Sequence, residues 1–261
     1  MTTFTTEDRI AVAPLQDRIT EWIRNYADQA GMKSLVVGIS GGIDSAVVSA
    51  LCARTGLNTV AVTMPIRQRP ELHDLSLAQG VWLCNNFDNV RHDIIDLTTT
   101  FDEFERRLGT YSNILGLANS RSRLRMVTLY QIAQSVNGLV VGTGNKVEDF
   151  GVGFYTKYGD GGVDISPIAD CYKTEVWQMG RELGILQDII DAPPTDGLWD
   201  DGRTDEDQLG GLTYQQLELA MSLDEGTVLV KSDLDLELLE KYQAIRARSL
   251  HKMNPIPVFK K

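Results

Sequence analysis

A glycine pair between a short apolar run and a helical pattern constrains this chain more than any other feature. Residues 35–39 predict a buried strand, and the segment Ser40-Gly41-Gly42-Ile43-Asp44-Ser45 leads from it into a helix predicted over 44–54. Glycines let a backbone approach an anion, and the first turn of a helix adds unpaired N–H donors and a partial positive charge. The segment therefore predicts a phosphate-binding loop.

Two common phosphate-binding motifs do not fit this loop. A Walker loop carries a lysine after its second glycine, and here that lysine is absent, as is the G-x-G-x-x-G dinucleotide fingerprint. A plain glycine-rich turn, with Asp44 or Ser45 as the helix N-cap, is the structural alternative. The strand before the loop and the helix after it favour the phosphate loop.

The rest of the chain alternates strand-like and helical patterns. Further strands are predicted at 59–64, 90–95 and 139–142. Helices are expected over 15–30, 72–83, 101–108, 117–136 and 233–250. Strands separated by helices form right-handed crossovers, so we predict an α/β fold with a doubly wound, largely parallel sheet and helices on both faces. Such a sheet binds ligands beyond the carboxyl ends of its strands.

Composition narrows the classes of function. The chain has 36 acidic and 25 basic residues and a net charge of −11, which argues against partners such as nucleic acid or an anionic membrane. Three cysteines, Cys52, Cys84 and Cys171, show no CxxC or Cys/His pairing, so we expect neither a disulfide framework nor a zinc site. Residues 1–9 are polar and no long apolar span follows, so we expect a soluble, cytoplasmic protein.

At its glycine-rich loop the chain resembles the PP-loop ATP pyrophosphatase superfamily, whose signature is SGGxDS after the first strand. Members of that group split ATP between the α and β phosphates, adenylate an oxygen, and let a nitrogen or sulfur nucleophile displace AMP. The resemblance implies an adenine-nucleotide alpha-hydrolase-like fold. It also implies that ATP is contacted by Gly38, Ile39, Ser40, Gly41, Gly42, Ile43, Asp44 and Ser45.

Sequence motifs in the second half of the chain point to one family within this superfamily. Gly142-Thr143-Gly144-Asn145-Lys146 precedes Phe154-Tyr155-Thr156-Lys157-Tyr158-Gly159-Asp160-Gly161-Gly162, and Lys173, Pro194-Thr195-Asp196-Gly197 and His251-Lys252 follow. This ordered set is similar to the ammonia-dependent NAD synthetase family, over essentially the whole chain. The resemblance implies that ATP adenylates the nicotinate carboxylate of deamido-NAD with release of pyrophosphate. Ammonia then attacks the acyl-adenylate, giving NAD and AMP.

The resemblance also implies roles for single residues. Asp44 and Lys173 are the expected catalytic residues, and Asp44 and Glu148 match the ligands of Mg²⁺, a hard cation that prefers carboxylate and phosphate oxygens. Between Glu148 and Gly153 this chain is one residue longer than many relatives, so Asp149 is a rival ligand. Further contacts to ATP are expected from Lys173, Thr143 and Thr195.

Five residues match contacts to deamido-NAD in the family. They are Arg123, Lys157, Asp164, His251 and Lys252. Helical spacing favours Arg123 over its neighbours, because it falls at the edge of the apolar arc of that helix and turns toward the interior. Arg121 and Arg125 are expected on the opposite face, solvated or paired.

The chemistry needs no covalent nucleophile, so Cys171 is expected to be only a small buried thiol. The acidic stretch 196–207 corresponds to a mobile flap in the family.

A glutaminase domain does not fit beside this fold, so we expect one NAD synthetase domain over 1–261, supplied with free ammonia or ammonia from another protein. A homodimer with the dinucleotide site at its interface is expected. The alternatives are another PP-loop amidotransferase or thiolase, or a catalytically silent nucleotide-binding sensor.

Overall fold

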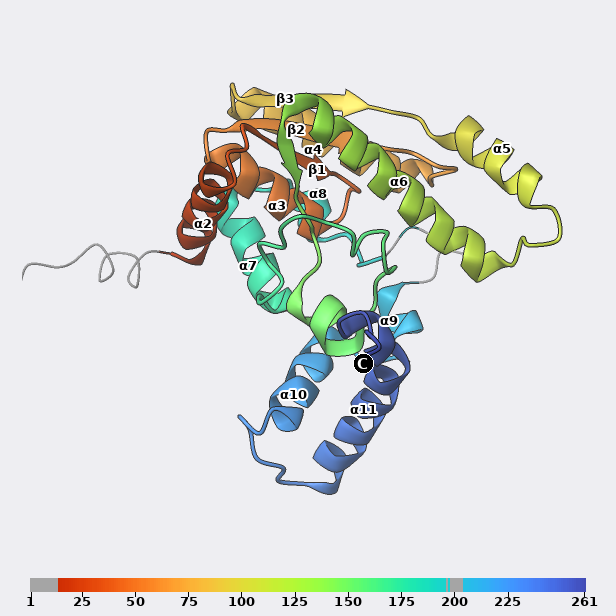
Figure 1. The fold of residues 1–261 in the computed structure, drawn as a ribbon. Coiled ribbons are helices and arrows are strands. Elements are labelled where there is room, and N and C mark those ends of the chain that lie inside the picture. The colour runs from red at the N-terminus through yellow and green to blue at the C-terminus, as the bar shows by residue number, and fades with distance from the viewer. Residues whose placement is uncertain (1–13, 196, 198–203) are drawn as a thin grey trace, which may run out of the picture.

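A computed structural model describes residues 14–195, 197 and 204–261, and Figure 1 shows its fold. The described strands form a parallel sheet in the order β3-β2-β1-β4. Their bounds are Ser34–Gly38 for β1, Asn58–Thr63 for β2, Val90–Ile94 for β3 and Gly138–Val140 for β4. Every predicted strand is present within two residues of its predicted ends, and the predicted parallel sheet is confirmed.

The six helices predicted from apolar spacing are also present. They are α2 (Leu15–Gln29), α3 (Ile43–Arg54), α4 (Pro70–Asn86), α5 (Thr98–Leu108), α6 (Ile114–Val136) and α11 (Asp233–Met253). The sequence patterns did not indicate α7 (Lys173–Leu183), α8 (Gln187–Ile190), α9 (Asp205–Gln208), α10 (Tyr214–Asp224) or the π-helix η1 (Lys146–Val152). Gly180 weakens the helical signal of α7, yet it lets α7 pack closely on α3, because a Cβ there would lie 2.7 Å from Ile43 Cδ1.

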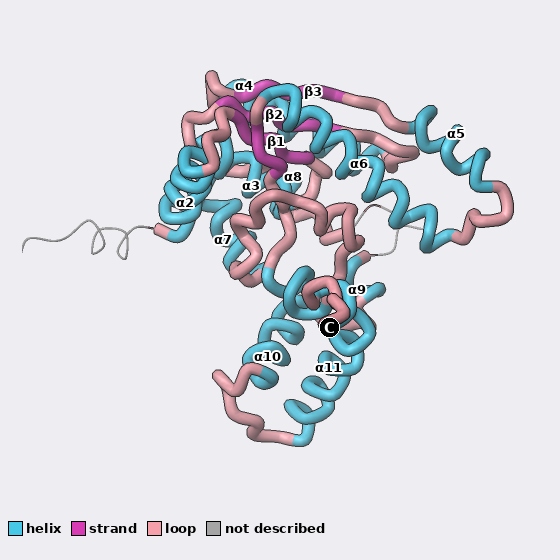
Figure 2. Tube along the Cα trace, viewed as in Figure 1, coloured by secondary structure: helices cyan, strands magenta, loops and turns pink. Residues whose placement is uncertain are grey.

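Alternate side chains of β1 enter two separate apolar cores. Leu35 and Val37 pack in one core with residues of α2, α3, α4, α7 and α8, whereas Val36 packs in the other with residues of α5 and α6. Successive strand residues point to opposite faces of a sheet, so both faces of this one are covered. Figure 2 shows helices on both sides of the strands, as predicted.

The order of the strands reverses beside β1. From β1 the chain crosses through α3 to β2 on one side, and after α5 and α6 it returns as β4 on the other, where Ser34 pairs with Gly138. The loops that follow β1 and β4 therefore leave the same edge of the sheet next to each other. This is the switch point at which open parallel sheets bind ligands.

A third apolar core lies outside the sheet. It joins Val147 and Val152 of η1 to Tyr214 and Leu217 of α10 and Tyr242 of α11. In Figure 1, α10 and α11 form an antiparallel pair that extends away from the sheet below η1. Among the described helices, none combines the length and the apolar character that crossing a membrane requires. The polar stretch 1–9 and most of the acidic stretch lie outside the described residues.

Candidate active site

Two serines hold the loop after β1. The Ser40 backbone N–H donates to Ser45 Oγ at 3.1 Å, and the Gly42 N–H donates to Ser40 Oγ at 3.2 Å. The Ser45 hydroxyl also lies 3.0 Å from the Gly42 carbonyl, to which it can donate. The N-cap residue of α3 is Gly42 rather than Asp44 or Ser45, and no side chain caps its first turn. The N–H groups of that turn are thus left for a ligand, as a phosphate loop requires.

Gly41 is the position where the loop demands glycine. Its φ is +92°, a backbone conformation that residues with a side chain rarely adopt. A Cβ at this position would also lie 2.5 Å from the Leu72 carbonyl oxygen of α4. The glycine therefore lets the loop pass directly over the first turns of α4.

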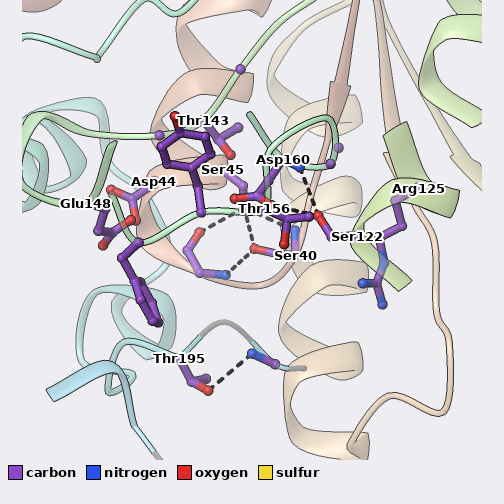
Figure 3. A pocket seen from close by; sticks show the side chains of 18 of the residues that line it. Ser40, Asp44, Ser45, Ser122, Arg125, Thr143, Glu148, Thr156, Asp160 and Thr195 are labelled. Carbon is purple, nitrogen blue, oxygen red and sulfur yellow. Dashed lines mark hydrogen bonds between the residues drawn. The ribbon is translucent and has the colours of Figure 1, made fainter. Parts of the chain in front are cut away.

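A cavity of about 870 Å³ opens at this edge of the sheet, and the loop forms one of its walls. Every site residue expected from the sequence lines this cavity except Asp164. Figure 3 shows Ser40 and Ser45 of the loop together with Thr143, Glu148 and Thr195, which come from three other segments of the chain. Residues more than a hundred positions apart in sequence thus meet at one site.

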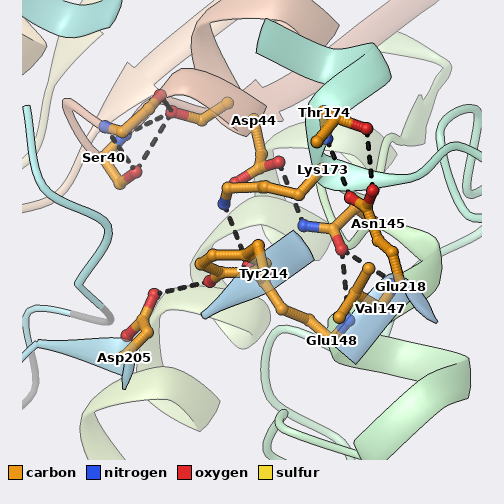
Figure 4. A network of polar contacts seen from close by, with 12 residues as sticks. Ser40, Asp44, Asn145, Val147, Glu148, Lys173, Thr174, Asp205, Tyr214 and Glu218 are labelled. Atoms are coloured by element: carbon orange, nitrogen blue, oxygen red, sulfur yellow. Dashed lines mark hydrogen bonds and ion pairs between the residues drawn. The ribbon is translucent and has the colours of Figure 1, made fainter. Parts of the chain in front are cut away.

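Lys173, at the start of α7, joins the two carboxylates expected to bind magnesium. Its Nζ lies 2.5 Å from Asp44 Oδ2 and 2.9 Å from Glu148 Oε1. The lysine side chain is 2% exposed, and the two carboxylate side chains are 17% and 15% exposed. Asn145 completes the cluster, because its side-chain amide donates to Asp44 Oδ1 at 3.1 Å (Figure 4).

Burial and the charge of Lys173 act in opposite directions on the carboxylates of this cluster, and burial prevails at Asp44, whose pKa is raised. Burial alone would lower the pKa of Lys173, but the adjacent carboxylates of Asp44 and Glu148 raise it above its usual range. Burial would raise the pKa of Glu148, yet the Lys173 ammonium and the Tyr214 hydroxyl hold it below its ordinary value. Lys173 is therefore a cation and Glu148 an anion at neutral pH.

The two candidate magnesium ligands, Glu148 and Asp149, make different contacts in the structure. Both lie in η1, and a π-helix is a widened turn that accommodates one extra residue. Asp149 lies against the Cα of Gly144, where a side chain at position 144 would collide with its carboxylate. Burial, followed by the charge of Asp160, holds the pKa of Asp149 well above its ordinary value. Glu148 Oε1 contacts Lys173 Nζ, which also contacts Asp44, so Glu148 is the acid that shares this lysine with Asp44.

The residues expected to contact the dinucleotide meet where the end of α11 packs on segment 153–157. Arg123 donates to the Lys157 carbonyl at 3.3 Å, and Lys157 Nζ donates to the His251 carbonyl at 3.3 Å. Lys252 Nζ donates to the carbonyls of Gly153 and, at 2.8 Å, Tyr155. These contacts hold Lys157 and Lys252 at the rim of the cavity, so both can meet an anionic substrate.

Asp164 differs from the other expected site residues. Its Oδ1 accepts a hydrogen bond from the Tyr130 hydroxyl at 3.0 Å, and its Oδ2 accepts one from the Val140 backbone N–H at 2.8 Å. Both carboxylate oxygens are therefore occupied within the chain. In this structure Asp164 stabilises the end of β4, and its contact with a substrate stays a prediction.

The expected arrangement of the three arginines on α6 is wrong. Arg121 is 7% exposed and lies over the Phe101 ring, at 5.3 Å from its centroid. Arg125 donates to the Met64 carbonyl and to Gln68 Oε1, both at 2.9 Å, and burial lowers its pKa to about 10. Arg123 is the exposed one. The apolar arc misled the prediction because α6 is covered on several sides, by α5 and by the loop after β2 as well as by the sheet.

Two functional candidates did not emerge from the sequence. Asp160 accepts a hydrogen bond from Ser122 Oγ at 2.6 Å and one from the Thr156 N–H at 3.0 Å, and it faces the cavity. Enclosure by protein raises its pKa above the ordinary value. The sequence feature that could have identified Asp160 is its position as an acidic residue within the glycine-rich segment 159–162. Tyr214 is the other candidate, and no motif surrounds it.

The glycine-rich loop, two acids and a buried lysine lie together at the switch point of a parallel sheet, and this arrangement defines an α/β protein with a PP-loop-type fold. Residues 15–256 match the model of the NAD synthase family. The chain therefore belongs to the NAD synthase family.

Similar proteins agree with that membership. An NH(3)-dependent NAD(+) synthetase from Alkaliphilus metalliredigens is 39% identical over 262 residues, which cover 94% of this chain and 98% of that protein. The structure of an NMN synthetase from Francisella tularensis has a TM-score of 0.84 and 30% identity, covering 95% of this chain and 98% of that one. An NH3-dependent NAD synthetase from Campylobacter jejuni shares the fold at a TM-score of 0.74 and 24% identity.

Proposed function

We propose that this protein catalyses the ATP-dependent amidation of deamido-NAD with ammonia, giving NAD, AMP and pyrophosphate. One observation carries the proposal: in a member of the NAD synthase family, the phosphate loop, the Asp44–Lys173–Glu148 cluster and the cationic rim of Lys157 and Lys252 line one cavity. A site of this kind suits two anionic substrates whose reacting groups must be brought together.

The chemistry begins with a poor electrophile. A nicotinate carboxylate resists attack by ammonia because its oxygen is a poor leaving group, and attack on the α-phosphorus of ATP converts it into an acyl-adenylate. Pyrophosphate leaves in that step, and the N–H groups of residues 40–45 would receive its charge. Lys173 would stabilise the same charge, since it stays protonated in its buried position. Ammonia then displaces AMP.

Asp44 and Glu148 fit a magnesium ion. Among the described residues no three or more acidic, histidine or cysteine side chains gather as a metal site, so these two acids stand alone. Mg²⁺ commonly takes one or two protein carboxylates and completes its shell with phosphate oxygens and water. When bound, it supplies neutralisation of the charge on the departing pyrophosphate. Asp44 Oδ1 and Oδ2 are held by Asn145 and Lys173, and Lys173 also contacts Glu148, so both acids are fixed around one ammonium group.

The nitrogen donor must lose a proton, because ammonium has no lone pair with which to attack. Asp160 faces the cavity, and its raised pKa makes its ionised form a stronger base than an ordinary aspartate. Ser122 and the Thr156 N–H hold one oxygen of this carboxylate in place. We infer that Asp160 accepts the proton from ammonium.

A second candidate function uses a smaller substrate. The structural likeness to an NMN synthetase from Francisella tularensis favours amidation of nicotinate mononucleotide by the same adenylate chemistry. This substrate has the same carboxylate but lacks the AMP half, so it would use fewer contacts at the cationic rim. The ratio of kcat/KM for the two substrates distinguishes the candidates.

The test is a turnover assay with purified protein, ATP, Mg²⁺ and ammonium. With deamido-NAD we expect equal yields of NAD and AMP, and loss of both in Asp44→Ala. Nicotinate mononucleotide and XMP are offered separately in the same assay. A kcat/KM that is higher for the mononucleotide moves the proposal to the second candidate, whereas AMP formed only with XMP, or no NAD at any ammonium concentration, contradicts it.

We propose that free ammonia serves as the nitrogen source. A glutaminase domain needs a nucleophilic cysteine, and this chain has three cysteines. Cys52 and Cys171 are buried, burial raises the pKa of Cys171 to about 11, and the exposed Cys84 does not line the cavity. We therefore expect no NAD when glutamine replaces ammonium in the assay.

We also propose that the chain forms a homodimer through α6. This helix exposes Ile114, Leu115 and Val127, whose exposed fractions are 74%, 60% and 57%. Leu115 and Arg123 of the same helix line the cavity, so a second copy on this face would border the substrate site. The partly exposed rings of Trp22 and Tyr26 on α2 form a second candidate surface, with weaker support because they do not line the cavity.

A further inference from the structure

Tyr214, the first residue of α10, reaches into the carboxylate cluster from outside the sheet. It is 1% exposed, and its hydroxyl oxygen lies 2.7 Å from Glu148 Oε1 and 3.2 Å from Asp205 Oδ2. Figure 4 shows the hydroxyl between these two acids, with Glu148 on the side of Lys173. The roles proposed above leave this contact unused.

The phenol has one hydrogen and two acidic neighbours, so its direction of donation can be worked out. The O–O distance to Glu148 is 2.7 Å, within the range of an O–H donor to a carboxylate, whereas the 3.2 Å to Asp205 lies outside it. Glu148 Oε1 also accepts from Lys173 Nζ at 2.9 Å, which keeps that carboxylate ionised. The hydrogen of Tyr214 therefore points to Glu148.

The ring of Tyr214 is fixed in that position. It packs edge-on against Trp177 of α7, with ring centroids 5.7 Å apart and planes at 83°. Lys173 Nζ lies 4.8 Å from its centroid. A ring held by both α7 and an ammonium group cannot swing away, so the hydroxyl is a rigid donor.

Glu148 needs such a donor because of where it lies. It belongs to the π-helix η1, a rare kind of turn that is frequently found at functional sites. The Asn145 side chain caps this turn by accepting from the N–H groups of Val147 and Glu148, but that contact fixes only the backbone. The carboxylate itself is held by Lys173 and Tyr214, with a further contribution from the Asn145 side chain.

We propose that Tyr214 is a positioning residue: its hydroxyl holds the Glu148 carboxylate in the orientation in which it faces Asp44 and, with ATP bound, the magnesium ion. The inference rests on the proposed function for ATP and Mg²⁺, but it concerns metal binding and not amidation. Groups that orient a metal-binding carboxylate commonly change metal affinity by about 10- to 100-fold when removed.

The test compares Tyr214→Phe with Tyr242→Phe. Tyr242 is a matched control, since it is 2% exposed, belongs to the same apolar core, and donates to η1 through the Gly151 carbonyl at 3.2 Å. Mn²⁺ is the probe, and its binding is followed by electron paramagnetic resonance in the presence of α,β-methylene-ATP, which cannot release pyrophosphate. We expect Tyr214→Phe to weaken Mn²⁺ binding at least about tenfold, or about 1.4 kcal/mol. Tyr242→Phe is expected to stay within twofold of the natural protein.

A double-mutant cycle checks that the effect passes through Glu148. In a Glu148→Gln background, Tyr214→Phe is expected to cause no further loss of Mn²⁺ affinity, because the carboxylate it positions is gone. Asp205→Asn tests the direction of donation without disturbing Tyr214. Its Mn²⁺ affinity is expected within twofold of the natural protein, and a tenfold loss there would show that the hydroxyl serves Asp205 instead.

The outcomes separate the inference from the proposed function. If the natural protein binds Mn²⁺ with the nucleotide and Tyr214→Phe binds it equally well, the inference is wrong and the proposed function stands. Equal losses in Tyr214→Phe and Tyr242→Phe would also overturn it, since they would mean a general effect on η1. If the natural protein binds no Mn²⁺ with the nucleotide, both fail.

Discussion

Lys173 is the residue on which the charge balance of the site depends. It is a 2% exposed ammonium group with one carboxylate on either side, at 2.5 and 2.9 Å. Removing one partner of a buried ionic cluster commonly costs about 3–5 kcal/mol, because the remaining charges are left uncompensated. Lys173→Met is therefore expected to lower the free energy of unfolding by this amount and to abolish measurable NAD formation.

Denaturant unfolding of Lys173→Met beside Lys146→Met provides the check. Lys146 is a suitable control because its ammonium, 21% exposed, lies 3.3 Å from the exposed Asp170 at the surface. Exposed pairs contribute at most about 1 kcal/mol. Similar losses of stability in both variants would contradict a special role for the buried cluster.

Substitutions of the neighbouring acids Glu148 and Asp149 are expected to have different effects on NAD formation. Glu148→Gln removes a proposed magnesium ligand, so NAD formation is expected to fall by at least about 100-fold. Asp149→Asn replaces an acid whose pKa is raised by burial and by Asp160. We expect it to keep activity within a few-fold and to raise the melting temperature at pH 7 by about 2–4 °C, the shift that corresponds to about 1 kcal/mol. Turnover and thermal unfolding of both variants measure this.

The pH dependence of this increase in stability in Asp149→Asn follows from the direction in which the pKa of Asp149 is shifted. The folded protein keeps the proton on Asp149 above its ordinary pKa of 3.8, while the unfolded chain releases it there. The folded state then binds more protons, so stability falls as the pH rises from about 4 through the folded pKa. In Asp149→Asn this fall is expected to be shallower. An advantage of the variant that is as large at pH 4 as at pH 7 would contradict the assignment.

Asp160 is expected to act in only the second half of the reaction. Asp160→Asn is predicted to lower the rate of NAD formation about 100-fold or more, the usual size of a lost general base. Exchange between pyrophosphate and ATP, measured with deamido-NAD but without ammonium, should remain within a few-fold because the adenylation step needs no base at this position. Asp170→Asn, at an exposed acid, is the control. Equal losses in exchange and in NAD formation would contradict this role.

At the scale of elements, the β1–α3 connection depends on one glycine more than on its neighbour. Gly41 has φ +92°, and a Cβ there would lie 2.5 Å from the Leu72 carbonyl, whereas a Cβ at Gly42 meets only Ser40 Oγ at 3.4 Å. Gly41→Ala is expected to weaken ATP binding at least tenfold and to destabilise the fold by about 1–3 kcal/mol. Gly42→Ala should retain most of the affinity. Calorimetric titration with α,β-methylene-ATP measures both, and similar affinities would contradict the argument.

Strands and helices with a clear apolar pattern in the sequence were predicted correctly. Helices that lack such a pattern were not predicted. Strands β1 to β4 and the helices with apolar stripes agree with the sequence patterns. A π-helix has no recognised apolar period, so η1 was not foreseen, although the extra residue after Glu148 fits its widened turn. The arginines of α6 were placed on the wrong faces because a single stripe cannot describe a helix that several elements cover.

At the scale of the whole molecule, the exposed face of α6 leads to a prediction about assembly. Val127 lies one helical turn after Arg123 and is 57% exposed. If a second copy covers this face, Val127→Glu buries a charge in an apolar interface and is expected to shift the protein from dimer to monomer and to raise the KM for the dinucleotide. Sedimentation velocity and steady-state kinetics provide the measurements.

Val81→Glu serves as the control for that experiment. Val81 is 59% exposed and lies on α4, away from the proposed interface. It should leave the sedimentation coefficient and KM unchanged. A natural protein that sediments as a monomer at all concentrations, with full activity, would contradict the proposed dimer.

The net charge of −11 describes the outside of this molecule and not its site. The cavity gathers the bases Arg123, Lys157, Lys173 and Lys252 beside the N-terminal end of α3, together with five acids, Asp44, Glu148, Asp149, Asp160 and Asp205. Within the acidic stretch, Asp205 is 5% exposed and contacts Tyr214. Net charge excludes broad polyanion binding without excluding a small anionic ligand.

The sequence by itself determined the order of the strands and of the helices with apolar stripes, the glycine-rich loop after β1 and the family, because these depend on short segments whose glycines, apolar period and residue order act locally. The tertiary structure alone decided that Glu148 shares Lys173 with Asp44, that Arg121 and Arg125 turn inward, and that Tyr214 contacts a carboxylate 66 positions away. Those facts depend on contacts between segments far apart in the chain, and such contacts exist only once the sheet has brought the segments together.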